Sequence, residues 1–177
     1  MNQRRSFLKS SVALASVIGM PALAKAAQSA PGERTLRLYN THTGESLRTV
    51  FWAQGQFIPD ALQDINKVLR DHRNNQVASM DPQLLLLLNQ VSGKFGDAQL
   101  HIISGYRSPE SNAKLHANSN GVAKHSMHME GKAIDIRMPG KDLAQVHKAA
   151  MALRSGGVGY YPDSQFVHMD TGRVRYW

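Results

Sequence analysis

The sequence has 177 residues and no cysteine, and its 21 basic against 13 acidic side chains give a formal net charge of +8. The lack of cysteine excludes disulfide bonds, thiolate metal ligands, a cysteine nucleophile and a lipid anchor on cysteine. The length suits one domain with a substantial hydrophobic core.

The first 26 residues have the features of a secretory leader of the twin-arginine kind. Arg4 and Arg5 stand side by side ahead of an apolar stretch, and the tripeptide AKA at 24–26 is a small-x-small cleavage site. The apolar stretch is too short and too mild for a membrane-spanning helix, which needs about 20 apolar residues. We therefore expect 1–26 to be a cleaved signal peptide, 27–177 to be a single domain in the periplasm, and no stable membrane insertion after cleavage.

The leader also accounts for half of the net charge. It holds four basic residues and no acidic one, so the charge of the remaining chain falls from +8 to +4. A charge of +4 suits a protein that works near an anionic polymer. No dense basic run with interleaved aromatic residues is present, which disfavours nucleic acid as the partner.

Apolar spacing predicts the elements of the remaining chain. A strand at 35–40 is expected to pair with one at 47–52, and helices follow at 57–73 and 80–96. A buried strand at 99–104 then leads through a loop into a helix within 105–117. The rest of the chain is predicted to form a strand at 132–138, a helix at 141–154, a glycine-rich bend at 156–165, and short strands at 166–170 and 173–177. Asp81 and Ser108 are predicted N-caps, each followed by proline in the first turn. This order predicts an α+β fold in which a small antiparallel sheet packs against helices.

The segment HSMHMEGKAIDIRM at 125–138 places polar residues directly ahead of an apolar strand. The pattern S-x-H-x-x-G-x-A-x-D puts His128 in a loop and Asp135 on the strand, and Gly131 permits the sharp turn between them. Ala133 lies on the same strand face as Asp135, where its small side chain leaves room beside the carboxylate. The spacing predicts that both side chains reach one point.

A third ligand is available in FVHMDTG, where His168 lies on a late strand. Catalytic zinc is held by three protein ligands of the His and Asp type and keeps one position open for water, whose pKa it lowers. We therefore predict one Zn²⁺ ion on His128, Asp135 and His168. Asp170 follows on the same strand face as His168, within reach of the metal's water.

The pattern S-x-H-x-x-G-x-A-x-D with a downstream H-x-D resembles that of the zinc peptidases of the D-alanyl-D-alanine carboxypeptidase and LAS type, and more closely that of the YcbK-type murein endopeptidases (MepK). The similarity covers nearly all of the chain after the leader, including TLRLYNTHTGE, SGYRSPESN and GGVGYYPDSQFVHMDTGRVRYW. It implies a zinc metallopeptidase of cell wall biogenesis that cleaves peptide cross-links of peptidoglycan, with His128, Asp135 and His168 as ligands.

The resemblance also implies a role for Arg107 of SGYRS, either stabilising the oxyanion of the transition state or holding a substrate carboxylate. The general base is open. Many relatives carry an acid three residues before the last ligand, where this chain has Gln165, so Asp170 is the first candidate, Asp163 the second and Glu130 the third.

Two other functions stay open. A D-alanine carboxypeptidase would use the same chemistry in a closed cleft, and the departure at Gln165 also permits a non-catalytic peptidoglycan-binding relative. His125, beside the motif, is either a group that supports the site or an exposed loop residue. Tyr160 and Tyr161 either line the cleft or pack in the core.

Overall fold

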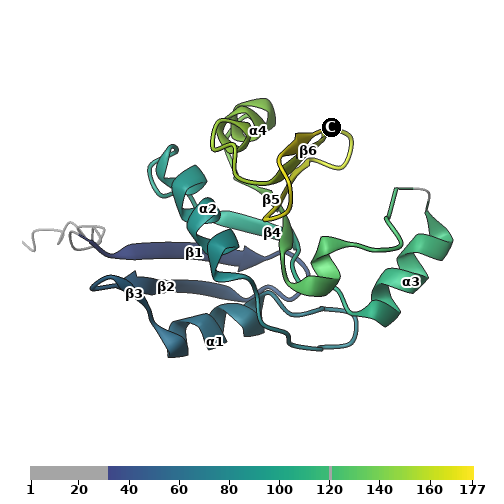
Figure 1. Cartoon of the computed structure of the whole chain (residues 1–177), viewed down its shortest axis with the longest axis horizontal. Helices are drawn as coiled ribbons and strands as arrows, with labels where there is room; N and C mark the ends of the chain where they lie inside the picture. The colour runs from purple at the N-terminus through teal and green to yellow at the C-terminus, as the bar shows by residue number, and fades with distance from the viewer. Residues whose placement is uncertain (1–31, 120) are drawn as a thin grey trace, which may run out of the picture.

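The structure is a computed structural model that describes residues 32–119 and 121–177 (Figure 1); the predicted leader at 1–26 lies outside the described residues. The strands are β1 (Arg34–Asn40), β2 (Ser46–Ala53), β3 (Gln56–Phe57), β4 (Leu100–Ser104), β5 (Ala133–Arg137), β6 (Gly157–Tyr161), β7 (Phe166–Asp170) and β8 (Arg175–Tyr176). The helices are α1 (Pro59–Val68), α2 (Pro82–Gly93), α3 (Pro109–Asn118), α4 (Leu143–Met151) and the short 3₁₀ helix η1 (Met127–Glu130).

All eight strands form one sheet in the order β3-β2-β1-β4-β5-β7-β6-β8. The pairs β1–β4 and β6–β8 are parallel and the other neighbours are antiparallel. The α+β class is therefore confirmed, but the expected small antiparallel sheet is wrong, because the sheet is large and mixed. The last strand does not return beside β7 as a hairpin; it passes over to the far edge of β6.

The helices form where the sequence provides their ends. Asp81 accepts a hydrogen bond from the backbone of Gln83 and caps α2, and Ser108 caps α3 in the same way through Ser111. The helix predicted at 57–73 ends earlier, at Val68, because the following residues turn to pack against the segment after β4.

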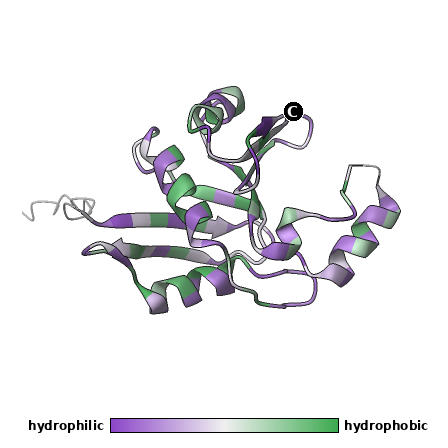
Figure 2. Cartoon of the chain, viewed as in Figure 1, coloured by the Kyte–Doolittle hydropathy of each residue, from purple (hydrophilic) through white to green (hydrophobic). Residues whose placement is uncertain are grey.

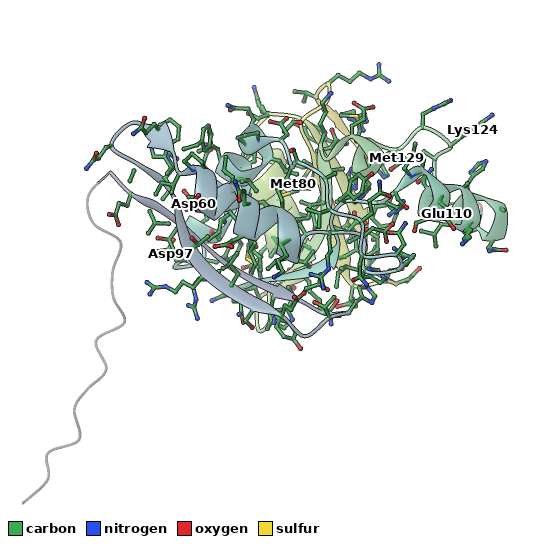
Figure 3. The ribbon with its side chains drawn as sticks, turned by 90° about the horizontal axis from the view of Figure 1, so that it is seen from below. Asp60, Met80, Asp97, Glu110, Lys124 and Met129 are labelled. Atoms are coloured by element: carbon green, nitrogen blue, oxygen red, sulfur yellow. The ribbon has the colours of Figure 1, made fainter. Side chains whose placement is uncertain are left out.

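The core lies between the sheet and helices α1, α2 and α4 (Figure 1), where Ile65, Leu84, Leu88 and Val146 are buried against the strands. Hydrophobic colour gathers on this part of the molecule, whereas α3 is largely hydrophilic and projects to one side (Figure 2). Seen from below, Met80 lies within the body, and Glu110 and Lys124 lie at the projecting end (Figure 3). No helix among the described residues is long and apolar enough to cross a membrane.

Strand β5 is buried on both faces, and this arrangement creates the site. Ile134 and Ile136 point into the core, so the alternate residues Ala133 and Asp135 point to the opposite face. A register irregularity in β4 after Ile102 pairs Ser104 with Asp135, which gives that opposite face a second polar group.

Candidate metal centre

The 3₁₀ helix η1 delivers the first predicted ligand. Ser126 caps it by accepting from the backbone of His128, and Gly131 ends it at a φ of +67°, where a β-carbon would collide with the carbonyl of Ser79. The His128 side chain is only 4% exposed, and its Nδ1 lies 2.7 Å from the carbonyl oxygen of Gly105. Because a carbonyl only accepts, Nδ1 donates to Gly105, and the other ring nitrogen, Nε2, faces Asp135 Oδ2 at 3.4 Å.

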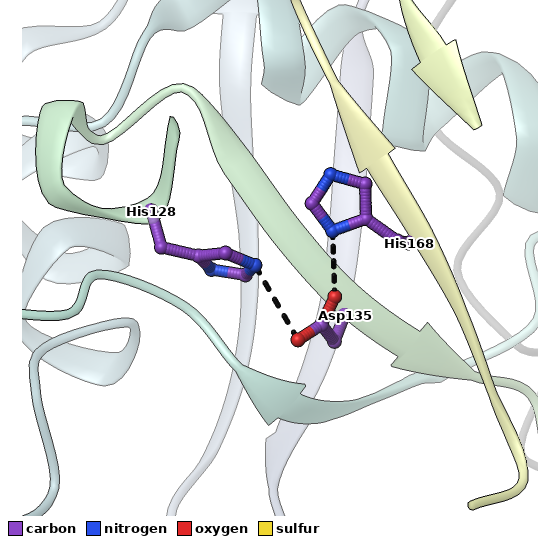
Figure 4. A group of neighbouring side chains, drawn as sticks. All are labelled: His128, Asp135 and His168. Carbon is purple, nitrogen blue, oxygen red and sulfur yellow. Dashed lines mark hydrogen bonds and ion pairs between the residues drawn. The ribbon is translucent and has the colours of Figure 1, made fainter. Parts of the chain in front are cut away.

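Strand pairing places the other two predicted ligands side by side. Asp135 of β5 is the register partner of His168 of β7, and His168 Nδ1 lies 2.8 Å from Asp135 Oδ1 (Figure 4). The far nitrogen of the same ring, Nε2, lies 3.0 Å from Asp170 Oδ2. The structure thus brings His128, Asp135 and His168 together, with one potential ligand atom from each within 4.8 Å of the others.

The donor set fits a zinc ion. Two imidazole nitrogens and one carboxylate oxygen converge, and each imidazole is fixed by a hydrogen bond from its other nitrogen, as is usual for metal-ligating histidines. Burial alone raises the pKa of Asp135, but His128 and His168 outweigh it and hold that pKa well below its usual range. Burial lowers the pKa of His168, but hydrogen bonds to Asp135 and Asp170 outweigh it and raise this pKa to about 9.

Asp170 lies behind the His168 ring rather than in the cleft. Its side chain is fully buried and accepts hydrogen bonds from the backbone of Gly157 and Gly172 at 3.1 and 2.8 Å. Arg175 adds two more, of 3.0 and 2.7 Å. Burial alone raises the pKa of Asp170, but His168 and Arg175 outweigh it and lower this pKa well below its usual range. A carboxylate so fully engaged is poorly placed to take a proton from water.

The two other candidates for the general base also lie apart from the ligands. Glu130 is exposed and pairs with Lys132 at 2.9 Å, and Asp163 is exposed in the turn between β6 and β7. Asp135 is the only acidic residue of the described chain that lines the cleft.

Arg107 lies beside the predicted ligands, as expected from its place after β4. It is 8% exposed, and its Nη2 lies 3.9 Å from Asp135 Oδ2. Its two terminal nitrogens donate to Asn112 Oδ1 and Ser104 Oγ, both at 3.3 Å. Its buried Nε has no hydrogen-bond partner among the described residues. Burial lowers the pKa of Arg107 more than Asp135 raises it.

The segment 105–108 links Arg107 to the first histidine. Gly105 accepts from His128, and Arg107 donates its backbone N–H to the carbonyl of His128 at 3.1 Å. The other side of the segment is fixed by Leu69, whose carbonyl accepts from Tyr106 at 2.8 Å, and by Asp71, which accepts from Ser108 at 2.9 Å. The sequence did not indicate this role of Asp71, because Ser108 lies 37 residues away.

We expect Asp71→Asn to lower the free energy of unfolding by about 2 kcal/mol at pH 7. Burial alone raises the pKa of Asp71, but hydrogen bonds from Ser111 and Ser108 outweigh it and lower this pKa to about 2 from 3.8, and one pKa unit is worth about 1.4 kcal/mol. Because the folded pKa is depressed, the stabilisation is complete above pH 4 and is lost as the pH falls towards 2. Urea unfolding of the wild type and the variant at pH 7 and pH 2.5 measures the difference in the free energy of unfolding. An equal difference at the two pH values would contradict the prediction. The substitution of an exposed aspartate, Asp163→Asn, is the control.

A cleft opens over the three predicted ligands. One side is formed by the loop 121–127, which includes His125 in an exposed position. The other side is formed by Tyr161, Phe166, Arg175 and Trp177. Tyr161 therefore lines the cleft, whereas Tyr160 points to the core and stacks on His147 of α4 at 4.9 Å between ring centroids. Arg175, Phe166 and Trp177 were not foreseen from the sequence. The path of β8 beside β6 brings Arg175 and Trp177 to this cleft.

A family model described as "Peptidoglycan L,D-endopeptidase MepK" matches residues 28–177. The chain belongs to this family. It is a family of zinc peptidases, in keeping with the His and Asp cluster. The chain is 43% identical over 177 residues to "Peptidoglycan L,D-endopeptidase MepK" of Escherichia coli (strain K12), with 99% of this chain and 97% of that protein covered. It is 42% identical over 178 residues to "Probable peptidoglycan L,D-endopeptidase MepK" of Haemophilus influenzae, with 99% and 95% covered. The resemblance inferred from the motifs is confirmed.

Proposed function

We propose that this protein is a zinc-dependent endopeptidase that cleaves an internal L,D peptide bond in the cross-links of peptidoglycan. The observation that carries the proposal is the convergence of His128, Asp135 and His168 beneath a cleft, in a chain whose relatives are named for this activity. Peptidoglycan lies outside the cytoplasmic membrane, so the substrate requires export. The twin-arginine leader at 1–26 and a periplasmic domain at 27–177 are part of the same proposal, supported by a family match that begins at residue 28.

Each of the two histidine rings would use one nitrogen to bind the ion and the other to fix the ring. His128 Nε2, His168 Nδ1 and a carboxylate oxygen of Asp135 would hold the ion, while the remaining ring nitrogens are anchored to Gly105 and Asp170. When bound, zinc supplies a Lewis acid that polarises a peptide carbonyl and makes water a stronger nucleophile at neutral pH. Anchoring both rings keeps the ligand atoms in place without the metal, which reduces the ordering cost of binding it.

Arg107 is proposed to stabilise the negative charge that develops on the oxygen of the scissile carbonyl. Its guanidinium is buried next to Asp135 and retains an N–H without a partner among the described residues. A fixed cation at this place stabilises negative charge as it develops on that oxygen. Ser104 and Asn112 hold the guanidinium so that little reorientation is needed during the reaction.

Asp170 is assigned to positioning rather than to the role of general base. It accepts from His168 Nε2, fixes the tautomer of the ring and strengthens it as a ligand. We expect Asp170→Asn to weaken zinc binding about 10- to 100-fold, while hydrolysis at saturating zinc stays within about tenfold of wild type. Zinc titration against a chromophoric chelator and a muropeptide assay measure the two quantities. Unchanged zinc affinity with turnover lost would restore Asp170 as the base.

Digestion of purified peptidoglycan tests the proposed function directly. We expect the protein to hold one zinc ion and to convert cross-linked muropeptide dimers to monomers, and we expect a chelator to stop the conversion and added zinc to restore it. A carboxypeptidase would instead shorten monomers and leave the dimers intact. A zinc-loaded protein that alters no muropeptide at any pH would contradict the proposal and favour a binding role.

A further inference from the structure

The aromatic side of the cleft begins at a glycine beside the metal centre. Gly159 of β6 is the register partner of His168, and a β-carbon at Gly159 would collide with the indole of Trp177. Strand β8 runs beside β6, and Trp177 continues this pairing by accepting a backbone hydrogen bond from Tyr160 at 2.9 Å and donating one to Val158 at 3.3 Å. The indole therefore lies on the site face of the sheet, with its centroid 5.3 Å from that of the His168 ring.

The indole is held in place but remains open to solvent. Its Nε1 donates to the hydroxyl oxygen of Tyr161 at 2.7 Å, and the Arg175 guanidinium lies 5.0 Å from the ring centroid. We call this side of the cleft, formed by Tyr161, Phe166, Arg175 and Trp177, the aromatic wall. Arg175 also donates to Asp170, and Asp170 accepts from His168, so hydrogen bonds connect the aromatic wall to the metal centre. Trp177 nevertheless stays 48% exposed. A rigid, half-exposed indole next to a reactive centre offers apolar contact at little entropic cost.

The hydroxyl group of Tyr161 is still able to donate a hydrogen bond. An indole N–H can only donate, so the hydroxyl oxygen of Tyr161 is the acceptor in their hydrogen bond. The hydroxyl proton of Tyr161 has no acceptor among the described residues. The ring is fixed by stacking on Phe166, with centroids 4.5 Å apart and planes inclined by 19°. The cleft thus presents a fixed donor next to a fixed apolar surface.

We propose that Trp177 and Tyr161 are specificity-determining residues that hold the substrate peptide beside the metal centre. The indole face packs against an aliphatic side chain of the cross-linked peptide, and the Tyr161 hydroxyl donates to a carbonyl or carboxylate oxygen of the same peptide. The opposite side of the cleft, the loop 121–127, offers no aromatic side chain other than His125. This assignment rests on the proposed function, and it places the main binding contacts on one wall.

Steady-state hydrolysis of a purified muropeptide dimer tests the assignment. We expect Tyr161→Phe to raise KM about 3- to 10-fold, the usual worth of one hydrogen bond, and Trp177→Ala to raise it by more than 10-fold, with kcat within about threefold and one zinc ion still bound in both. Tyr176→Phe is the matched control, because Tyr176 donates its hydroxyl to Met151 instead, and its KM is expected to match wild type. Unchanged KM in both wall variants would overturn the proposal, as would a loss of kcat alone.

A binding measurement separates this proposal from the proposed function. The chain has two tryptophans, and Trp52 lies on β2 against Phe57, so Trp52→Phe leaves Trp177 as the only indole. We expect the dimer to change the emission of this variant saturably, and added Tyr161→Phe to shift the midpoint to higher concentration. This change is expected even if the dimer is not cleaved, in which case only the hydrolase activity fails. If calorimetry shows saturated binding of the dimer but the emission of Trp177 does not change, the proposal that Trp177 contacts the substrate is wrong.

Discussion

Replacement of His128 by alanine is expected to lower zinc affinity on the order of 1000-fold and to reduce muropeptide hydrolysis to background. Structural zinc sites bind with about 10–16 kcal/mol shared among their ligands, so the loss of one ligand removes several kcal/mol. The substitution also leaves the buried carbonyl of Gly105 without its donor, at a cost of about 1–3 kcal/mol in stability. Competition with a chromophoric chelator, hydrolysis of muropeptide dimers and thermal unfolding measure the three effects.

The matched control is His116→Ala. His116 is an exposed histidine of α3 whose Nδ1 bonds the carbonyl of Val122, and it lies outside the ligand cluster. Zinc content and turnover of this variant are expected to equal those of wild type. If His128→Ala instead keeps one zinc ion with an affinity within tenfold of wild type, the ligand assignment is wrong, whatever happens to activity.

The sequence was most informative where the signals are local. The caps at Asp81 and Ser108 and the turn at Gly131 are short-range features, and the structure has all three. Strand alternation placed Ala133 and Asp135 on one face, and the structure confirms this because β5 continues without a bulge. The convergence of His128, Asp135 and His168 followed from these local rules together with a motif.

Strand β6 was missed for a reason that lies in the tertiary structure. Its sequence GVGYY follows another glycine and has weak strand propensity, since glycine is disfavoured in strands. Gly157 and Gly159 are nevertheless required there, because the side chains of Arg175 and Trp177 occupy the places where β-carbons would lie. Those neighbours come from β8 and the chain end, so no local pattern reveals them.

The role of Asp170 shows the limit of reasoning from strand faces. The alternation correctly placed Asp170 beside His168, but it did not indicate which ring nitrogen the carboxylate meets. That nitrogen is Nε2, on the side of the ring away from Asp135. The contacts with Gly157 and Arg175 come from β6 and β8, and the contact with Gly172 comes from the turn between β7 and β8. For this reason a neighbour on the same face is proposed as a support for the predicted ligand His168.

Replacement of Arg107 by alanine is expected to lower kcat about 100- to 1000-fold, the usual effect of removing one donor to a developing oxyanion, with zinc content unchanged. Arg107→Lys is expected to recover only part of the rate, because an ammonium keeps the charge but cannot bond Ser104 and Asn112 in the same plane. Steady-state kinetics on muropeptide dimers separate kcat from KM in both variants. Arg137→Ala, which removes an exposed arginine from the end of β5, is the control.

The partition between kcat and KM decides between the two roles that the sequence left open for Arg107. A group that acts on the transition state lowers kcat with little change in KM, whereas a group that binds a substrate carboxylate raises KM. The buried position next to Asp135 and the unpaired Nε favour the first role, because a carboxylate brought to this place would lie close to the carboxylate of Asp135. A raised KM with kcat preserved would assign Arg107 to substrate binding and leave the oxyanion without a side-chain donor.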